Sequence, residues 1–175
     1  MEKQRALISA LQSQLSDEER ALCDPVIAYL LELGYTPQTH KKNTFAVEFR
    51  KNGRIISKME IGRDPNCLIF FLRFSASGEY SDIFQRAVAR RPEAWIKRNQ
   101  EYVNHKMEDC CRNCKGNPRF YHFYENDGAK IVRCGGYTLP IPDITHHHLP
   151  ELLRLMKEQD DFFRDILSCT TVMSI

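Results

Sequence analysis

The sequence has none of the features that direct a chain to a membrane or mark it for export. No stretch approaches the roughly 20 apolar residues that a membrane-spanning helix needs, and the charged N-terminal residues 1–5 lack the apolar core of a secretory signal. The net charge is only +2, from 25 basic and 23 acidic side chains, so no global field attracts nucleic acid or an anionic lipid surface. These absences predict a cytoplasmic protein with no membrane partner.

Recognisable catalytic motifs are absent as well. The chain contains no nucleophile elbow, phosphate-binding loop, dinucleotide fingerprint or helical His-Glu-x-x-His. No acid-base pair stands out by spacing. A non-catalytic binding or accessory domain is therefore more strongly expected than an enzyme.

What is present is the composition of a globular domain. The 175 residues are 42% hydrophobic and 27% charged. A chain of this length can bury a hydrophobic core that is stable without disulfide cross-links. We expect a single domain over residues 1–175. It is expected to have three parts: N-terminal helices in 1–40, a first sheet-and-helix unit in 44–106 and a cysteine-containing second unit in 107–168.

Apolar spacing predicts that the chain begins with helices. Leu7, Leu11 and Leu15 recur every four residues and so form one face of a short helix. Ser16 and Glu19 have the spacing of a capping box, which starts a second helix that runs to Gly34. A proline inside that helix, at position 25, is expected to kink or split it.

From residue 44 the pattern becomes that of strands. Residues 45–49 and 55–61 alternate between apolar and polar positions on either side of Asn52-Gly53, a pair that favours the type I′ turn of a hairpin. Residues 67–74 are apolar at nearly every position, as in a central strand. A helix capped by Ser81 completes the first unit.

The second unit repeats this order. A hairpin is expected around residues 126–128, and a third strand follows at 137–141, where two prolines confine it to a sheet edge. The last helix starts near Leu149-Pro150. Together the two hairpin-strand-helix units, preceded by the N-terminal helices, predict an α+β fold with an antiparallel sheet of about five or six strands.

The repeated order resembles, in fold only, the two-copy effector-binding domains that are similar to the DNA gyrase inhibitor. Such folds often leave a cleft between their copies. The resemblance therefore implies a cleft between the sheet halves, where a small molecule could bind; as a likeness of fold alone it assigns no ligand.

The cysteines carry the strongest chemical signal. Seven cysteines, an odd number at irregular spacings, favour free thiols or metal ligands over a disulfide framework. Cys111 and Cys114 have the two-residue spacing that lets two sulfurs reach one tetrahedral zinc ion, and Cys134 is the expected third ligand. The fourth ligand is open among Cys110, His105 and His122. A site closed by four protein ligands would be structural, because it leaves no position for a substrate.

Other interpretations of these cysteines stay open. They also fit unliganded reduced thiols in a surface loop, or a redox pair of Cys111 and Cys114 that adjacent basic residues help to ionise. The redox pair is the basis of one alternative function, a small thiol-dependent enzyme. The remaining cysteines, Cys23, Cys67 and Cys169, lie within apolar patterns and are expected to be buried.

Two further patterns have simple structural explanations beside functional ones. The run His146–His148 could chelate a divalent metal, but consecutive side chains diverge, and polar groups are also expected at the start of a helix, where backbone donors are free. The basic stretch from Arg86 to Arg98, with Trp95, suits a nucleic-acid accessory protein, the second alternative function. A solvated helix face explains it equally well, so nucleic acid is not an expected partner.

Overall fold

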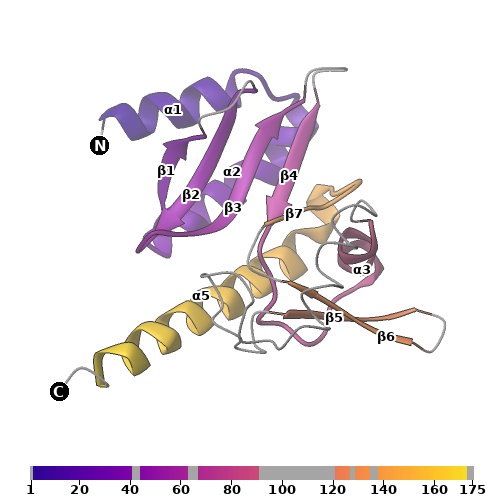
Figure 1. The fold of residues 1–175 in the computed structure, drawn as a ribbon. Helices are drawn as coiled ribbons and strands as arrows, with labels where there is room; N and C mark the ends of the chain where they lie inside the picture. Colours follow the sequence, from indigo (N-terminus) through magenta and orange to yellow (C-terminus); the bar gives the residue numbers. More distant parts are fainter. Residues whose placement is uncertain are drawn as a thin grey trace.

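The computed structural model describes residues 2–40, 44–62, 67–90, 121–126, 129–134 and 138–172 (Figure 1). In residues 121–126, 129–134 and 167–172 only the backbone is described. Within these ranges, helices precede a five-stranded antiparallel sheet, and a long helix ends the chain. The predicted α+β class and the leading helices are confirmed. No helix of the described part combines the length and the apolar character that crossing a bilayer requires.

Two helices begin the fold, α1 (Glu2–Gln12) and α2 (Asp17–Glu32). The capping box of α2 is confirmed, because the Ser16 hydroxyl accepts from the Glu19 N–H at 3.3 Å and the Glu19 carboxylate accepts from the Ser16 N–H at 2.8 Å. Helix α2 continues through Pro25 without a break. Cys23 and Val26, on either side of the proline, are fully buried, so core packing offsets the lost backbone hydrogen bond.

The main sheet has the order β1-β2-β3-β4-β7, and every neighbouring pair is antiparallel. Its strands are β1 (Thr36–Thr39), β2 (Ala46–Lys51), β3 (Arg54–Ile61), β4 (Leu68–Leu72) and β7 (Leu139–Pro140). The turn between β2 and β3 has φ angles of 51° at Asn52 and 74° at Gly53, both positive as a type I′ turn requires. The predicted hairpin is therefore confirmed.

The core lies between the helices and one face of this sheet. The register pairs Val47 with Met59 and Met59 with Phe70, and all three side chains are fully buried. They belong to one cluster with residues of α1, α2 and the last helix, α5 (Leu149–Val172). Figure 1 shows α2 behind the sheet and α5 running past its lower end.

The second unit contributes to the sheet differently from its predicted role. Its hairpin, β5 (Tyr121–Asn126) and β6 (Ala129–Cys134), forms a separate two-stranded sheet beside helix α3 (Asp82–Ala89) in Figure 1. Among the described strands of this unit, β7 alone joins the main sheet, at its edge, as the prolines predict. The fifth strand is instead β1, which the sequence pattern did not indicate.

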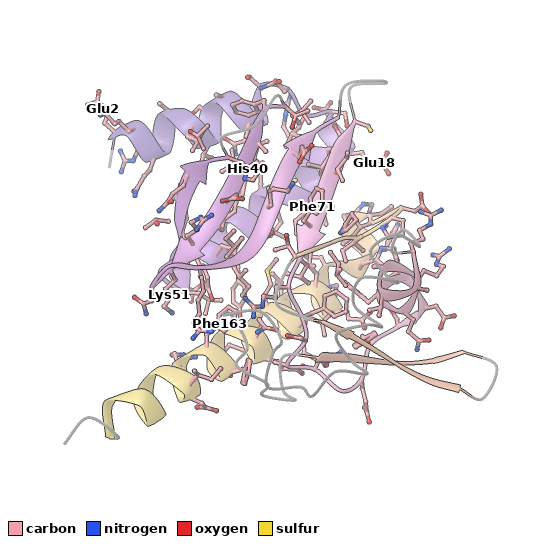
Figure 2. All side chains as sticks on the ribbon, viewed as in Figure 1. Glu2, Glu18, His40, Lys51, Phe71 and Phe163 are labelled. Atoms are coloured by element: carbon pink, nitrogen blue, oxygen red, sulfur yellow. The ribbon has the colours of Figure 1, made fainter. Side chains whose placement is uncertain are left out.

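Helix α5 is joined to the sheet through buried charges. The Asp160 carboxylate, on a residue that is 1% exposed, accepts from Lys51 Nζ at 2.9 Å and forms an ion pair with Arg164, whose Nε lies 3.1 Å away. The guanidinium groups of Arg54 and Arg73 lie 5.2 and 4.8 Å from the centre of the Phe163 ring. Figure 2 shows Lys51 and Phe163 at this junction. Buried ionic groups therefore hold the middle of α5 in place.

Candidate functional site

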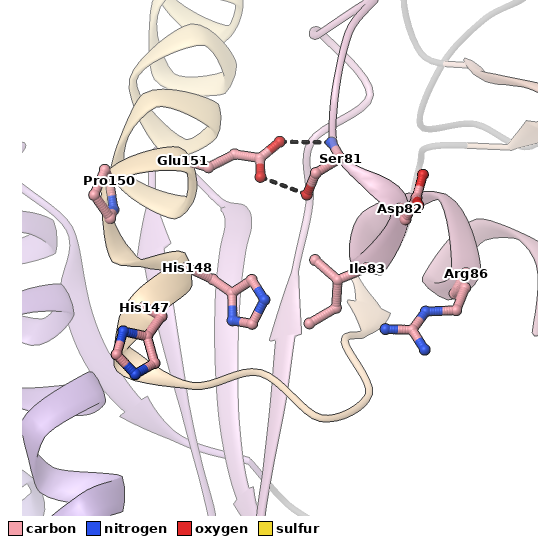
Figure 3. A pocket seen from close by; sticks show the side chains of 8 residues that line it. All are labelled: Ser81, Asp82, Ile83, Arg86, His147, His148, Pro150 and Glu151. Atoms are coloured by element: carbon pink, nitrogen blue, oxygen red, sulfur yellow. Dashed lines mark hydrogen bonds between the residues drawn. The ribbon is translucent and has the colours of Figure 1, made fainter.

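The candidate site is an open pocket of about 680 Å³ between α3 and the start of α5 (Figure 3). The short 3₁₀ helix η3 (His146–His148), which leads directly into α5, forms one side. The pocket is lined by Ser81, Asp82, Ile83, Arg86, His147, His148, Pro150 and Glu151. It thus lies where the two predicted units meet, between helices instead of between two halves of a sheet.

One wall of the pocket is a contact between residues 70 positions apart. The Glu151 carboxylate accepts from the Ser81 backbone N–H at 2.7 Å and from the Ser81 hydroxyl at 2.6 Å. Ser81 does precede α3 as predicted, but its hydroxyl makes no capping hydrogen bond within the helix. Glu151 therefore takes both donors of Ser81 and joins the start of α3 to the first turn of α5.

The three consecutive histidines lie at the start of α5 and have different roles. The Thr145 backbone N–H donates to His148 Nδ1 at 3.2 Å, so this ring does satisfy a backbone donor next to the helix. The His146 and His147 rings lie 4.0 Å apart and are tilted by 39°. Within the described residues, no group of three His, Cys, Asp or Glu side chains could hold a metal ion. A metal role for the trio alone is therefore not supported.

The bond to Thr145 also determines which nitrogen of His148 is the donor. Because a backbone N–H can only donate, Nδ1 must hold a lone pair. The neutral ring then carries its proton on Nε2. Figure 3 shows the ring directed from η3 toward Ile83, so His148 presents an N–H donor to the pocket.

Arg86 lies across the pocket from His148. It is an exposed residue of α3, and among the described residues its guanidinium has no hydrogen-bond or ion-pair partner. Figure 3 shows the guanidinium and the His148 ring on opposite sides of Ile83, both facing the same space. The sequence pattern indicated Arg86 only as one member of a basic stretch. Its place opposite His148 depends on tertiary structure.

Most of the predicted metal ligands lie outside the described residues. This is true of Cys110, Cys111, Cys114 and His105. Cys134 is the last residue of β6, and its Cα pairs with that of Tyr121, the first residue of β5 and the seventh after Cys114 in the chain. Cys134 therefore lies at the open end of the hairpin, on the side that the chain enters from Cys114.

The cysteines expected to be buried differ from one another. Cys23 is fully buried, and burial, with the nearby Glu19 and Asp24 charges, raises the pKa of its thiol to about 12. The expectation for Cys67 was wrong, because that residue is exposed just before β4. It lines a second, smaller pocket of about 290 Å³ beside the start of α2. The side chain of Cys169 is outside the described part.

In comparison with known proteins, the chain matches no family model, no curated protein and no solved structure.

Proposed function

We propose that the chain is a non-catalytic binding or accessory domain that takes a small molecule in the pocket between α3 and α5. The observation that carries the proposal is the pocket itself, which lies where the two units of the chain meet. Its shape is supported by a wall that the contact between Ser81 and Glu151 holds in place. A site fixed in this way needs little ordering when a ligand binds, which favours affinity.

The use of the pocket's polar groups supports binding over acid-base chemistry. Both oxygens of the Glu151 carboxylate accept from Ser81, so this group is committed to the wall. His148 Nδ1 is committed to Thr145. A general base needs a free lone pair within reach of the substrate proton. The single lone pair of His148 Nδ1 is already used, and the two hydrogen bonds from Ser81 hold the Glu151 carboxylate against the wall.

Binding can be tested by following backbone amide signals of the ¹⁵N-labelled full chain while small aromatic compounds of either charge, and uncharged ones, are added. We expect saturable shifts at Ser81, Ile83 and His148 with at least one class of compound. Signals of the β2–β3 hairpin, which lies away from the pocket, serve as the internal control. Shifts that are confined to other surfaces, or no saturable shifts at all, would contradict the proposal.

We further propose that Cys111, Cys114 and Cys134 hold a structural zinc ion, with Cys110 as the fourth ligand. The place of Cys134 at the open end of its hairpin supports this proposal. His122 occupies the position next to the Tyr121–Cys134 pair. Neighbouring strand positions belong to opposite faces, so the register favours Cys110 or His105 over His122 as the fourth ligand. Zinc is favoured over harder cations because thiolates are soft ligands.

Elemental analysis of protein purified without an affinity tag tests the zinc proposal. We expect about one equivalent of zinc, since thiolate sites bind it tightly. Cys114→Ser should lose the metal, whereas Cys67→Ser, which removes an exposed thiol outside the proposed site, should retain it. Less than about a tenth of an equivalent in the unsubstituted protein would exclude a structural zinc site.

A further inference from the structure

We infer that the pocket between α3 and α5 binds a small organic oxyanion, a carboxylate or a phosphate ester, through Arg86 and His148. This inference rests on the proposed binding function and adds the chemical class of the ligand. It rests on three observations: two donors face the pocket, the acidic side chains of the lining are directed elsewhere, and part of the lining is apolar.

The first donor is the Arg86 guanidinium. It has no partner among the described residues and faces the pocket in Figure 3. A guanidinium offers several N–H donors in one plane, which match two oxygens of a carboxylate or a phosphate at the same time. An oxyanion in the pocket would therefore receive paired, charge-assisted hydrogen bonds from this side.

The second donor comes from the opposite side. His148 keeps its Nδ1 lone pair for the Thr145 N–H, which leaves Nε2–H as the group available to a ligand. Unlike Arg86, this ring is held in position by its own hydrogen bond. A ligand oxygen between the two residues would thus meet a cationic donor on one side and an N–H donor fixed by its ring's hydrogen bond on the other.

Neither acidic residue that lines the pocket directs its carboxylate toward the space between Arg86 and His148. Glu151 accepts both donors of Ser81, and Arg154 Nη2 lies 3.6 Å from its carboxylate. Asp82 lies in the first turn of α3, and Figure 3 shows its carboxylate on the side of that helix away from His148. Among the charged lining residues, Arg86 is the one that Figure 3 shows directed toward the space beside Ile83.

The remaining lining gives the ligand an apolar part. Pro150, an exposed residue, supplies most of the hydrocarbon surface next to the two donors, and the largely buried Ile83 lies between them. A pocket with a few directed polar groups and an apolar wall is typical of sites for small organic molecules. An aromatic or aliphatic body that carries one oxyanion fits this lining better than a bare inorganic ion does.

Four compounds with the same ring distinguish an anionic ligand from a neutral or cationic one: benzoate, phenyl phosphate, uncharged benzamide and cationic benzylamine. Each is titrated into the ¹⁵N-labelled full chain while the amide signals of Ile83 and His148 are followed. We expect benzoate or phenyl phosphate, or both, to bind at these positions more tightly than benzamide and benzylamine. Which of the two anions binds more tightly distinguishes a carboxylate ligand from a phosphate ester.

Substitutions identify the donors. Arg86→Gln should weaken anion binding at least about tenfold, the loss expected for a charge-assisted hydrogen-bonded pair. Arg90→Gln makes the same charge change one turn further along the chain, outside the pocket lining, and should change affinity less than about twofold. His148→Ala should weaken binding roughly two- to tenfold, whereas His146→Ala, at a neighbouring histidine outside the lining, should not.

The outcomes are distinguishable. If benzamide or benzylamine binds at the pocket and neither anion does, the oxyanion inference is overturned and the binding function stands. If no compound of any charge binds there, both the oxyanion inference and the proposed binding function are overturned. Anion binding that Arg86→Gln and Arg90→Gln weaken equally reflects general charge attraction and also overturns the assigned site. Selective loss in Arg86→Gln, with an unchanged melting temperature, is the result that supports it.

Discussion

The polar side chains in the middle of helix α5 and those around its start have different roles. In its middle, Asp160 is buried and is paired with Lys51 and Arg164. Beside its start, Arg86 of α3 and His148 of η3 face an open pocket with donors that have no partner among the described residues. A polar group whose hydrogen bonds are all internal contributes to the fold, whereas a group that keeps a donor at a pocket can contribute to binding.

Removing the buried charge should produce the largest effect. Asp160→Ala leaves Lys51, whose side chain is 25% exposed, without its anion. Breaking a buried pair in this way should lower the free energy of unfolding by about 3–5 kcal/mol. Denaturant unfolding followed by circular dichroism measures the change.

The adjacent carboxylate is the matched control. Asp161 is 46% exposed at its side chain and pairs with Lys157 on the surface of the same helix. Asp161→Ala should therefore cost less than about 1 kcal/mol. Equal losses at the two positions would contradict the distinction between the buried junction and the surface of α5.

Loosening the pocket wall should have a smaller effect on stability and a clear one on binding. Ser81→Ala removes the hydroxyl that donates to Glu151 at 2.6 Å, which should cost about 1 kcal/mol. It should also weaken the affinity for any compound that binds in the pocket. Ser77→Ala, in the loop before α3, removes a hydroxyl outside the pocket lining and is the control. Unchanged affinity in Ser81→Ala would show that the wall does not shape the site.

The smallest expected effect is a pH dependence at the start of α2. Burial raises the pKa of Glu19, but hydrogen bonds from the Ser16 N–H, the Leu68 N–H and the Ser16 hydroxyl outweigh it, so that the pKa is lowered from its ordinary 4.5. A carboxylate with a lowered pKa stabilises the fold above its ordinary value, and this stabilisation is lost as the pH falls through the folded-state pKa. Glu19→Gln should therefore be less stable than the unsubstituted chain at neutral pH.

The difference between the two proteins should shrink as the pH falls below about 4.5. Unfolding at a series of pH values measures it. Glu18→Gln, at the exposed preceding residue, controls for the loss of one negative charge near the start of α2. A difference between Glu19→Gln and the unsubstituted chain that stays constant across the acid range would contradict a role for the ionised Glu19 carboxylate.

Local chemistry explains which parts of the fold were predictable. The capping box of Ser16 and Glu19 acts within one helical turn, and Asn52-Gly53 sets its turn through its own backbone angles. Pro140 keeps β7 at an edge because it has no N–H to donate. Each of these signals acts within a few residues, so each could be identified from the sequence.

The unpredicted parts depend on distant partners. Strand β1 has the sequence Thr-Pro-Gln-Thr, with no apolar alternation, and it is a strand because it pairs with β2. The pocket depends on Glu151 meeting Ser81, which is 70 residues away. Cys67 is exposed although apolar residues follow it. Composition and periodicity contain no signal for any of these contacts. The sequence therefore shows the histidine run but not the pocket that surrounds it.

The continuity of α5 has a mechanical consequence. Glu151 and Asp160 belong to one helix and are nine residues apart, so they are separated by about 14 Å along its axis. A tilt of the helix about the anchored Asp160 would displace Glu151 and, through it, Ser81 and the start of α3. The width of the pocket thus depends on how firmly Asp160 anchors the middle of the helix. A substitution at Lys51 or Asp160 can therefore change ligand affinity although neither residue lines the pocket.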